Sequence, residues 1–461
     1  MTKPLSNSSS LQPIEPNHKQ IWSLAWPMII SNLSIPMVGI VDTAILGHLD
    51  SPEYLAAVAT GASLITFLFW SFGFLRMGMS GLTANALGRR NNEGVLTLLI
   101  QGATLALVLG VILVLGRALF LALSVYAMNL PSNLSDLVRS YCDIRIYSAP
   151  FVLLNYALIG WFIGRQNTKI PLLILITTNV SNALFDWWFV IELGLSSDGA
   201  ALASVLGEVT GSIIAIIAIG LALKKIRAKL DEHGKSREQK KHWQIIYSAL
   251  TNWKSYATFL NVNRFLFVRT AVLLLVIVFF VKQGVQQGTV VAAANAVLMQ
   301  LVGVISYGLD GFAHAAEALI GKAQGQNHRR SIIVGCQRTG LWAIATAAGF
   351  TAFFLLFKSP LLTLFSDIPE VLHTASIFYG WVVFMPLISV WGYQLDGIFI
   401  GLGKAQSMQN TILVSALAVF LPIWWVTHPL GNHGLWLAFA CFNGARGISL
   451  FWVLTRYLRG I

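Results

Sequence analysis

Charged residues are scarce in this sequence: they make up 11% of its 461 residues, whereas hydrophobic residues make up 56%. Soluble domains carry about 25% charged residues, which cover the surface that faces water. The shortage excludes a soluble globule of this size and indicates a chain that uses lipid as its solvent. We therefore expect a membrane protein whose constant partner is the lipid bilayer.

Acidic residues are the rarer sign of charge, with 19 Asp and Glu against 31 Lys and Arg, and the formal net charge is +12. The basic residues lie in short clusters between apolar stretches, and no basic and aromatic module accompanies them. This distribution is typical of cytoplasmic membrane loops. We expect no nucleic acid partner.

Cysteine is also rare, and Cys142, Cys336 and Cys441 each stand alone in an apolar segment. No CxxC pair or histidine cluster accompanies them, so neither a disulfide framework nor a metal site is predicted. Ser/His/Asp, HExxH and phosphate-loop signatures are missing as well. We expect no enzymatic activity, no metal and no cofactor, so that an ion gradient rather than ATP drives any active transport.

Long apolar stretches, in contrast, are abundant. A bilayer core of about 30 Å needs about 20 apolar residues per helix. Twelve stretches reach that length and predict an all-α membrane protein with twelve transmembrane helices. They cover residues 21–46, 54–75, 95–119, 138–164, 171–191, 199–223, 256–281, 289–318, 331–357, 374–400, 408–427 and 435–455.

Lys and Arg gather in every even connection between these stretches, from Arg89 and Arg90 to Lys404, and the odd connections are nearly bare of them. Cytoplasmic loops collect Lys and Arg, so both termini are predicted to lie in the cytoplasm. The N-terminus carries no basic-then-apolar signal with a small-residue cleavage site. We expect a multi-pass protein of the inner (cytoplasmic) membrane.

The two halves of the chain repeat each other at one offset. Three pairs of matching residues are each separated by 237 positions: Gly88 and Gly325, Gly164 and Gly401, and Trp187 and Trp424. Because six is an even number, two six-helix copies enter the membrane from the same side, which gives parallel repeats. We expect a flexible cytoplasmic tail over residues 1–18 and two lobes over residues 19–223 and 256–461.

The basic stretch over residues 224–255 joins the two predicted lobes. We interpret it as a flexible cytoplasmic linker that lets the lobes move apart. An amphipathic segment around residues 243–247 that binds lipid headgroups is an equally good interpretation.

Carboxylates inside the predicted helices need an explanation, because one at mid-bilayer depth costs about 2.5 to 3.5 kcal/mol. There are seven: Asp42, Asp143, Asp186, Glu208, Asp310, Glu317 and Asp396. Six arginines lie within or at the ends of the same segments: Arg76, Arg145, Arg264, Arg269, Arg338 and Arg446. For any one acid, structural pairing and a functional role are equally good interpretations.

Asp42 stands out because its own segment has no basic residue after Lys19. A carboxyl group buried without a cation favours its protonated form, which is the property that a proton carrier needs. Pro27 and Pro36 in the same helix each remove a backbone hydrogen bond and favour a kink. We predict that this helix bends as Asp42 titrates; static kinks are the alternative.

A polar stripe follows one face of the fifth helix. Asn179, Asn182 and Asp186 are separated by three and four residues, which places them on that face. The stripe suits a proton or small-cation site together with Asp42 if the two helices touch. Interhelical hydrogen bonding, at about 1 kcal/mol per bond, is the alternative.

The second half carries charges on the seventh, eighth and tenth predicted helices of the chain: Arg264, Arg269, Asp310, Glu317 and Asp396. We interpret them as a structural charge network, with the two arginines as counter-ions. The position that repeats Asp42 is Phe279, so the halves have diverged in their chemistry.

Four stretches resemble the multidrug and toxic compound extrusion (MATE) family, in its branch of DNA-damage-inducible F proteins. They are residues 40–49 (IVDTAILGHL), 309–312 (LDGF) with Glu317 and Ala318, 395–401 (LDGIFIG) and 430–433 (LGNH). The resemblance spans nearly the whole chain after the tail. It implies two six-helix lobes arranged as a V around a central cavity, which exchange H⁺ or Na⁺ for an organic substrate.

The resemblance also implies roles for residues of the first lobe. Asp42 matches the first-helix acid of the family, and Pro27 matches its bending proline. Asn182 and Asp186 match the fifth-helix pair. Ser204 falls where the family commonly has a hydroxyl group on the sixth helix.

In the second lobe, Asp396 resembles a tenth-helix acid that is associated with cation binding in another branch. The seventh-helix acid of some members is missing, because residues 260–264 (LNVNR) contain no carboxylate. This departure favours proton coupling through the first lobe.

We therefore predict a monomeric secondary antiporter that exports amphipathic organic compounds or drugs in exchange for H⁺ or Na⁺. A flippase for a lipid-linked precursor is the main alternative, since such a protein lines its cavity with arginines such as Arg264 and Arg269. A major-facilitator transporter fits less well, because the loop after the second helix lacks its Asp-Arg pair. A non-transporting scaffold does not account for a buried acid beside a bendable helix.

Overall fold

The computed structural model describes residues 15–46, 52–128, 132–231, 247–251 and 253–460. Within these ranges all regular structure is helical, which confirms the predicted all-α class. Residues 1–14 of the predicted tail and 232–246 of the predicted linker lie outside the described residues.

The first half of the chain holds helices α1 to α9. They are α1 (His18–Leu46), α2 (Pro52–Trp70), α3 (Phe74–Gly88), α4 (Asn92–Leu115), α5 (Arg117–Met128), α6 (Ser132–Arg145), the 3₁₀ turn η1 (Ile146–Ser148), α7 (Ala149–Gly164), α8 (Lys169–Asp186), the π-helical η2 (Trp187–Glu192) and α9 (Ser196–Asp231).

The second half repeats this order after a short helical segment at residues 247–251. Its elements are α11 (Trp253–Gln286), α12 (Thr289–Gly325), α13 (Arg329–Leu356), α14 (Lys358–Thr363), α15 (Pro369–Gly401), α16 (Ala405–Val414), the π-helical η3 (Ser415–Phe420), α17 (Leu421–Thr427), the 3₁₀ turn η4 (His428–Leu430) and α18 (Asn432–Gly460).

Eleven helical spans among the described residues are long and apolar enough to cross a membrane, and each corresponds to one predicted stretch. The remaining predicted stretch is α1, whose side chains are described only in part; its 29 residues extend about 44 Å at 1.5 Å per residue, which is enough to span. Large apolar side chains such as Leu115, Leu356 and Ile448 are 75–77% exposed on the flanks. Such a surface requires lipid around it.

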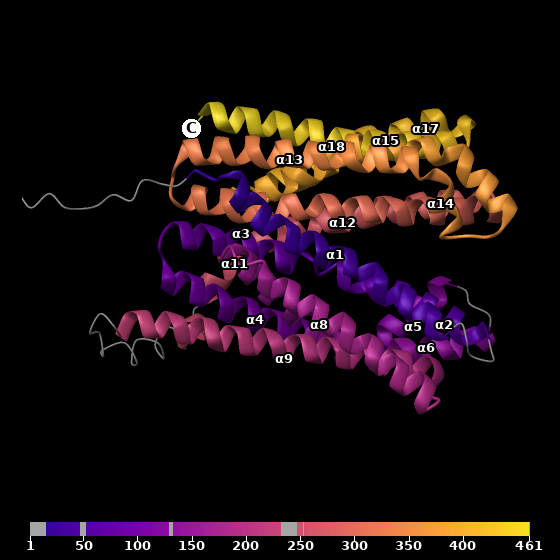
Figure 1. Ribbon diagram of the computed structural model, residues 1–461, viewed down its shortest axis with the longest axis horizontal. Coiled ribbons are helices and arrows are strands. Elements are labelled where there is room, and N and C mark those ends of the chain that lie inside the picture. The colour runs from indigo at the N-terminus through magenta and orange to yellow at the C-terminus, as the bar shows by residue number, and fades with distance from the viewer. Residues whose placement is uncertain (1–14, 47–51, 129–131, 232–246, 252, 461) are drawn as a thin grey trace, which may run out of the picture.

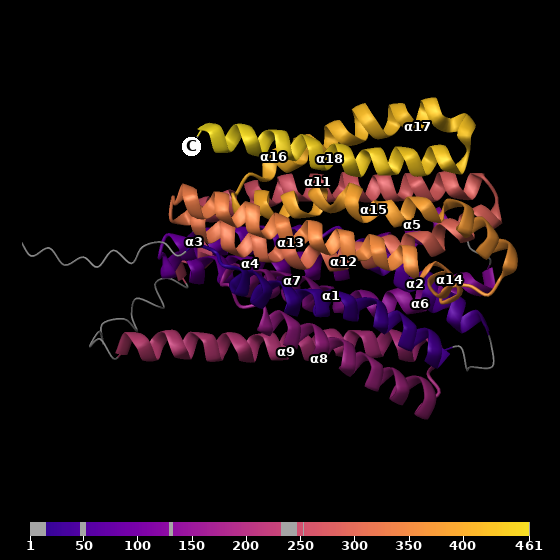
Figure 2. The same ribbon diagram turned by 45° about the horizontal axis from the view of Figure 1, so that its top comes forward.

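The two halves of the chain form two lobes that lie side by side (Figure 1). Helix α1 runs obliquely between them, and it contacts both α8 of its own lobe and α12 of the other. Turning the molecule separates the helices that overlap in the first view (Figure 2). Two short helices that the sequence did not predict, α5 and α14, lie at corresponding places in the two halves.

The lobes are in close contact at two glycines that are repeat equivalents. A Cβ atom on Gly88 would lie 2.9 Å from the Cα of Gly325, and one on Gly325 would lie 3.0 Å from the Cα of Gly88. Within the lobes, a Cβ on Gly164 would lie 2.5 Å from the carbonyl of Ser80, and one on Gly401 would lie 2.9 Å from the carbonyl of Glu317. Small residues let helices approach closely, so the duplication is visible in the packing itself.

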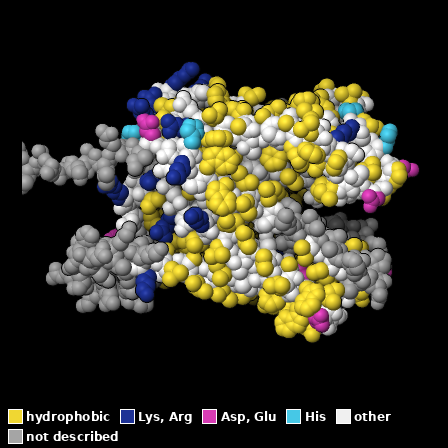
Figure 3. Space-filling view, viewed as in Figure 1, with side chains coloured by type: hydrophobic (Ala, Val, Ile, Leu, Met, Phe, Trp, Pro, Cys, Tyr) yellow, Lys and Arg dark blue, Asp and Glu magenta, His cyan; other side chains and the backbone are white. Residues whose placement is uncertain are grey.

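Charge is unevenly distributed along the lobes. Lys and Arg gather at the end where the C-terminus lies, and the visible face between the ends is mostly apolar (Figure 3). The face is hollowed between the lobes at the opposite end (Figure 3). The lobes therefore converge at the end that carries the basic residues and diverge at the other.

Candidate functional site

Two carboxylates of the first lobe meet between α1 and α8. The side chains of Asp42 and Asp186 lie within hydrogen-bonding range of each other. The amide of Asn182 lies within the same range of the Asp186 carboxylate, and no N–H or O–H donor of the described residues makes a closer contact with Oδ1 of Asp42 or with either carboxylate oxygen of Asp186. Because an ionised carboxylate only accepts hydrogen bonds, a bond between the two groups requires a proton on one of them.

Hydrogen bonds to neighbouring helices surround this pair. Asn179 donates to the hydroxyl of Ser34 on α1 at 2.7 Å, and Asn182 donates to the hydroxyl of Ser204 on α9 at 3.3 Å. The polar stripe of α8 therefore faces α1 on one side and α9 on the other. The structure brings all five predicted first-lobe site residues into one region.

Local sequence explains how α8 presents the stripe. Pro171 lies in the first turn of α8, where its missing N–H has no intrahelical partner to lose. A Cβ on Gly211 of α9 would lie 2.1 Å from the hydroxyl of Thr178, so this glycine lets α9 pack directly against α8. The α-helix changes to a π-helical turn immediately after Asp186, a feature that is frequent at functional sites.

Arg145 is a member of this site that the sequence did not single out. Its positive charge acts on both Asp42 and Asp186. The guanidinium donates to the hydroxyl of Ser148 at 2.5 Å and lies 5.7 Å from the ring of Phe69. The helix of Asp42 carries no basic residue after Lys19, and in the folded protein the cation near Asp42 comes from α6.

A second polar group behind the pair was also missed. Asn155 on α7 donates to the carboxylate of Glu208 on α9 at 3.0 Å, and it accepts from the hydroxyl of Ser212 at 3.0 Å. Asn155 is 4% exposed. The only signal available in the sequence was the acid itself, since an asparagine in an apolar run carries no indication of its partner.

Both prolines lie inside α1, which is helical from His18 to Leu46. Pro27 cannot donate to the carbonyl of Ser23, and the hydroxyl of Thr168 at the start of α8 donates to that carbonyl at 3.4 Å instead. Pro27 is buried, and its own carbonyl accepts from the hydroxyl of Ser31 at 2.7 Å. The side chain of Pro36 lies outside the described part of the structure.

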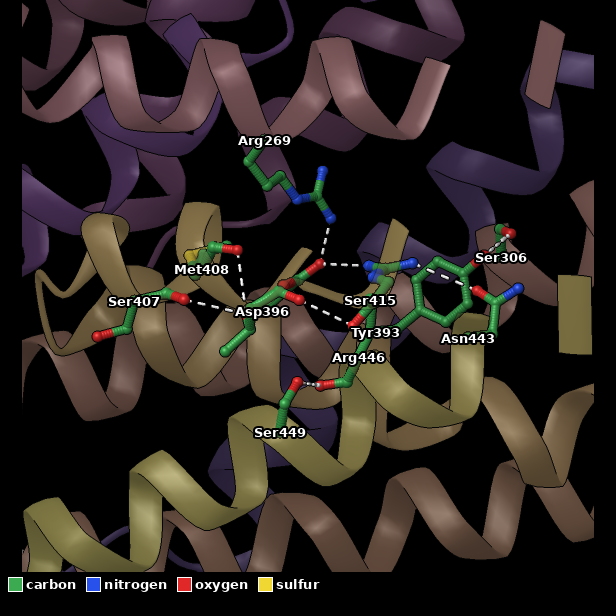
Figure 4. Close-up of polar contacts among 11 residues, drawn as sticks. Arg269, Ser306, Tyr393, Asp396, Ser407, Met408, Ser415, Asn443, Arg446 and Ser449 are labelled. Atoms are coloured by element: carbon green, nitrogen blue, oxygen red, sulfur yellow. Dashed lines mark hydrogen bonds and ion pairs between the residues drawn. The ribbon is translucent and has the colours of Figure 1, made fainter. Parts of the chain in front are cut away.

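In the second lobe, Asp396 lies between two arginines from different helices (Figure 4). Arg269 on α11 and Arg446 on α18 both bind Oδ2 of Asp396, the latter at 2.8 Å. Arg446 also donates to Asn443 at 3.3 Å, and the hydroxyls of Ser306 and Tyr393 are hydrogen bonded beside it. All three charged residues are less than 10% exposed.

The other predicted members of the second-lobe network lie apart from this ion pair. Glu317 accepts from His314, which contacts Arg76 of the first lobe. Asp310 is half-buried, within electrostatic reach of Arg76 and Arg269. Arg264 is exposed, lies 4.6 Å from the ring of Phe265, and forms no ion pair with a described residue. The sequence predicted Arg264 and Arg269 as the counter-ions, and in the structure Arg269 and Arg446 bind Asp396.

No group of three or more His, Cys, Asp or Glu side chains among the described residues is arranged to hold a metal ion. The three cysteines are free thiols.

Comparisons with known proteins identify the family. The MatE family profile matches residues 27–188 and again residues 266–426, once in each half. DNA damage-inducible protein F of Escherichia coli (strain K12) is 36% identical over 447 residues, which cover 96% of this chain and 93% of that protein. A probable multidrug resistance protein NorM of Geobacillus kaustophilus (strain HTA426) is 24% identical, over 90% of this chain and 88% of that protein.

Solved structures share the fold. An outward-facing multidrug resistance MATE family transporter superposes with a TM-score of 0.81 at 19% identity, over 96% of this chain and 97% of that one. A MOP superfamily transporter from Pyrococcus furiosus also reaches 0.81 at 19% identity, with 95% of each chain covered. The chain therefore belongs to the MATE family of multidrug efflux transporters, and it is a membrane transporter rather than an enzyme.

Proposed function

We propose that this protein is a secondary antiporter that exports amphipathic organic compounds in exchange for protons. Asp42 and Asp186 carry the coupling proton, and Asn179, Asn182 and Ser204 hold the helices that bear them. The observation that carries the proposal is the carboxyl pair itself: two acids lie within hydrogen-bonding range of each other, and Asn182 is the one side-chain donor near Asp186 among the described residues. A proton held between them is the simplest way to keep two such groups together inside a membrane.

The two states of the pair have different demands on the surrounding helices. Without a proton, two negative charges repel at close range, and the charge of Arg145 and the amide of Asn182 oppose that repulsion. With a proton, the acids attract, and α1 is drawn toward α8. Pro27 and Pro36 make α1 the helix in which a bend costs least, so protonation and bending of α1 are coupled.

Alternating access follows from the two lobes. The lobes converge at the end with the basic residues, which we assign to the cytoplasm, and they diverge toward the other side; this is an outward-facing arrangement. Both termini lie in the cytoplasm, the segment over residues 224–255 joins the lobes there, and a monomer in the inner membrane is the working unit. Residues 224–231 of that segment continue α9 as helix.

Reconstituted exchange is the direct test. We expect a pH gradient to drive counter-transport of a fluorescent amphipathic compound in liposomes, and we expect Asp42→Asn and Asp186→Asn each to reduce it to the level of protein-free liposomes. Asp143→Asn is the matched control, because Asp143 pairs with Arg117 at a site where both side chains are about 40% exposed. Undiminished pH-driven transport by Asp42→Asn would refute proton coupling through Asp42.

The same liposomes distinguish proton coupling from sodium coupling, and antiport from lipid flipping. A sodium gradient without a pH gradient should drive no exchange if the pair carries protons. A flippase would move a fluorescent lipid between leaflets without any gradient. The arginines that favoured a flippase in the sequence do not support it here, because Arg269 is bound to Asp396 and Arg264 is exposed.

A further inference from the structure

A buried polar cluster joins the two lobes and is distinct from the carboxyl pair of the first lobe. Its members are Arg76 on α3 of the first lobe and His314 and Glu317 on α12 of the second. Glu317 precedes Gly325 by eight residues, or about 12 Å along the helix. The cluster therefore lies in the half of the molecule where the lobes converge, and its contacts across α3 and α12 are contacts between the lobes.

The contacts of His314 favour one position for its proton. Nη1 of Arg76 lies 2.5 Å from Nε2 and 3.4 Å from Nδ1 of the ring, and Nδ1 lies 3.2 Å from Oε2 of Glu317. A guanidinium has only donors, so Nε2 must accept and cannot carry a proton. The single proton of the neutral ring is then on Nδ1, where it donates to the Glu317 carboxylate. The neutral ring with its proton on Nδ1 satisfies the shorter Arg76 contact and the Glu317 contact together, whereas a doubly protonated ring offers Arg76 no acceptor.

Burial makes the contact sensitive to charge. His314 is 5% exposed and Glu317 is 2% exposed, with Arg76 half-buried beside them, so water screens charges that face the histidine only weakly. A second proton on His314 would sit on Nε2 and point at the N–H groups of Arg76. Two cations would then be in direct contact in a buried site, and Arg76 would have to withdraw from α12.

The surrounding charges come from several elements. They are Glu317 and Asp310 on α12 itself, Arg76 on α3, Asp396 on α15, Arg269 on α11 and Arg446 on α18. From α1, Trp22, Ile29 and the amide of Asn32 face α12, and from α13, Trp342 stacks on Phe312; none of these side chains is charged. The acids attract a proton to this region, but Arg76 is the cation in direct contact with Nε2, so it is the Arg76 bond that protonation breaks.

We propose that Arg76, His314 and Glu317 form an inter-lobe lock that a proton on His314 opens. While the ring is neutral, the lock holds α3 against α12 and keeps the lobes closed at this end. When the ring is protonated, α3 separates from α12. The conformation that is open toward the cytoplasm then becomes accessible. The inference rests on the alternating-access function proposed above and adds a second proton site, in the second lobe, that gates lobe separation.

Hydrogen–deuterium exchange of the full chain in lipid nanodiscs tests the lock without substrate or gradient. The informative peptides cover residues 81–89 at the end of α3 and 318–326 at the end of α12. We expect their exchange, corrected for the intrinsic effect of pH on the chemistry, to become about tenfold faster between about pH 8 and about pH 5, because closed helix ends then open.

Variants separate the lock from a general effect of acid. In His314→Gln, the amide oxygen can accept from Arg76 and the amide N–H can donate to Glu317 without titrating, so we expect slow exchange at every pH. Arg76→Gln should give fast exchange at every pH. His433→Gln is the matched control, because His433 accepts from Trp381 within the second lobe, and it should behave as the unmodified protein does.

Two outcomes would overturn the proposal: exchange at these helix ends that is unaffected by pH in the unmodified protein, or a response to pH that survives in His314→Gln. Transport in liposomes is measured separately. If antiport is intact and the exchange at these helix ends does not depend on pH, this inference alone is refuted. If the exchange depends on pH as expected and the protein shows no antiport, the proposed function alone is refuted.

Discussion

Asp396 is held by two buried arginines from different helices. Two guanidiniums from α11 and α18 share one of its carboxylate oxygens, and Nε of Arg269 has no further partner among the described residues. Removing one partner from a buried ion pair leaves an uncompensated charge, which costs more than the pair itself contributes. The site therefore stabilises the second lobe as long as all three residues are present.

Asp396→Asn should lower the stability of the protein. Two buried arginines then lose their counter-ion, and we expect a loss of about 3 to 5 kcal/mol, seen as a lower midpoint of thermal unfolding in detergent. Asp143→Asn, which removes a half-exposed pair with Arg117, should cost less than about 1 kcal/mol. Equal midpoints for the two variants would show that Asp396 is not a structural anchor.

At the residue scale, the sequence identified the acids and could not identify their partners. An acid inside an apolar helix is conspicuous by its cost in lipid, whereas its counter-ion is chosen by tertiary packing. Arg145 and Arg446 were two of six candidate arginines. Arg264 could have been set aside, because it is five residues from Arg269 and thus about 140° away around the helix.

Helix α1 packs against helices of both lobes. It contacts α8 near the carboxyl pair, and its Trp22 packs edge-on against Phe312 of α12 and Trp342 of α13. A bend in α1 therefore changes contacts in both lobes together. This placement makes α1 a mechanical link as well as the carrier of Asp42.

Pro27→Ala should stabilise α1 and slow transport. Alanine restores the N–H that the carbonyl of Ser23 lacks, and proline inside a helix costs about 3 kcal/mol relative to alanine. We expect a higher unfolding midpoint together with reduced pH-driven exchange. Pro369→Ala is the control, because Pro369 begins α15, where proline has little effect on the helix. Normal exchange in Pro27→Ala would argue that the bend is static.

At the element scale, hydropathy predicted the spanning helices well and their lengths less well. The predicted stretch 289–318 became α12, which continues to Gly325, because helices extend past the bilayer core into polar residues that hydropathy does not count. Helices α5 and α14 are too short to span a membrane, so a search for stretches of about 20 residues could not find them.

At the scale of the whole molecule, the arrangement of the two lobes depends on their close contact near Gly88. A side chain at position 88 would meet the carbonyl of Lys322 at 2.1 Å, which leaves no room for it in the present arrangement. We expect Gly88→Leu to force the lobes apart and to accelerate deuterium exchange of residues 318–326. Gly349→Leu is the control, since no atom lies within 4 Å of a Cβ at that position. Unchanged exchange in Gly88→Leu would mean that the lobes are not in contact there in solution.

Gly88 and Gly325 also bear on the origin of the chain. They occupy equivalent positions of the two halves and touch each other, which is the geometry of a residue that meets its own copy across a twofold axis. Before duplication joined the halves, a single six-helix polypeptide could have made the same contact as a symmetric homodimer. The carboxyl pair of the first lobe, the ion pairs around Asp396 and the histidine between the lobes each occur in one half alone, because Asp42, Asp396 and His314 have Phe279, Ile159 and Met77 at their repeat positions. A symmetric homodimer carries every such group twice, whereas a duplicated chain can carry it once.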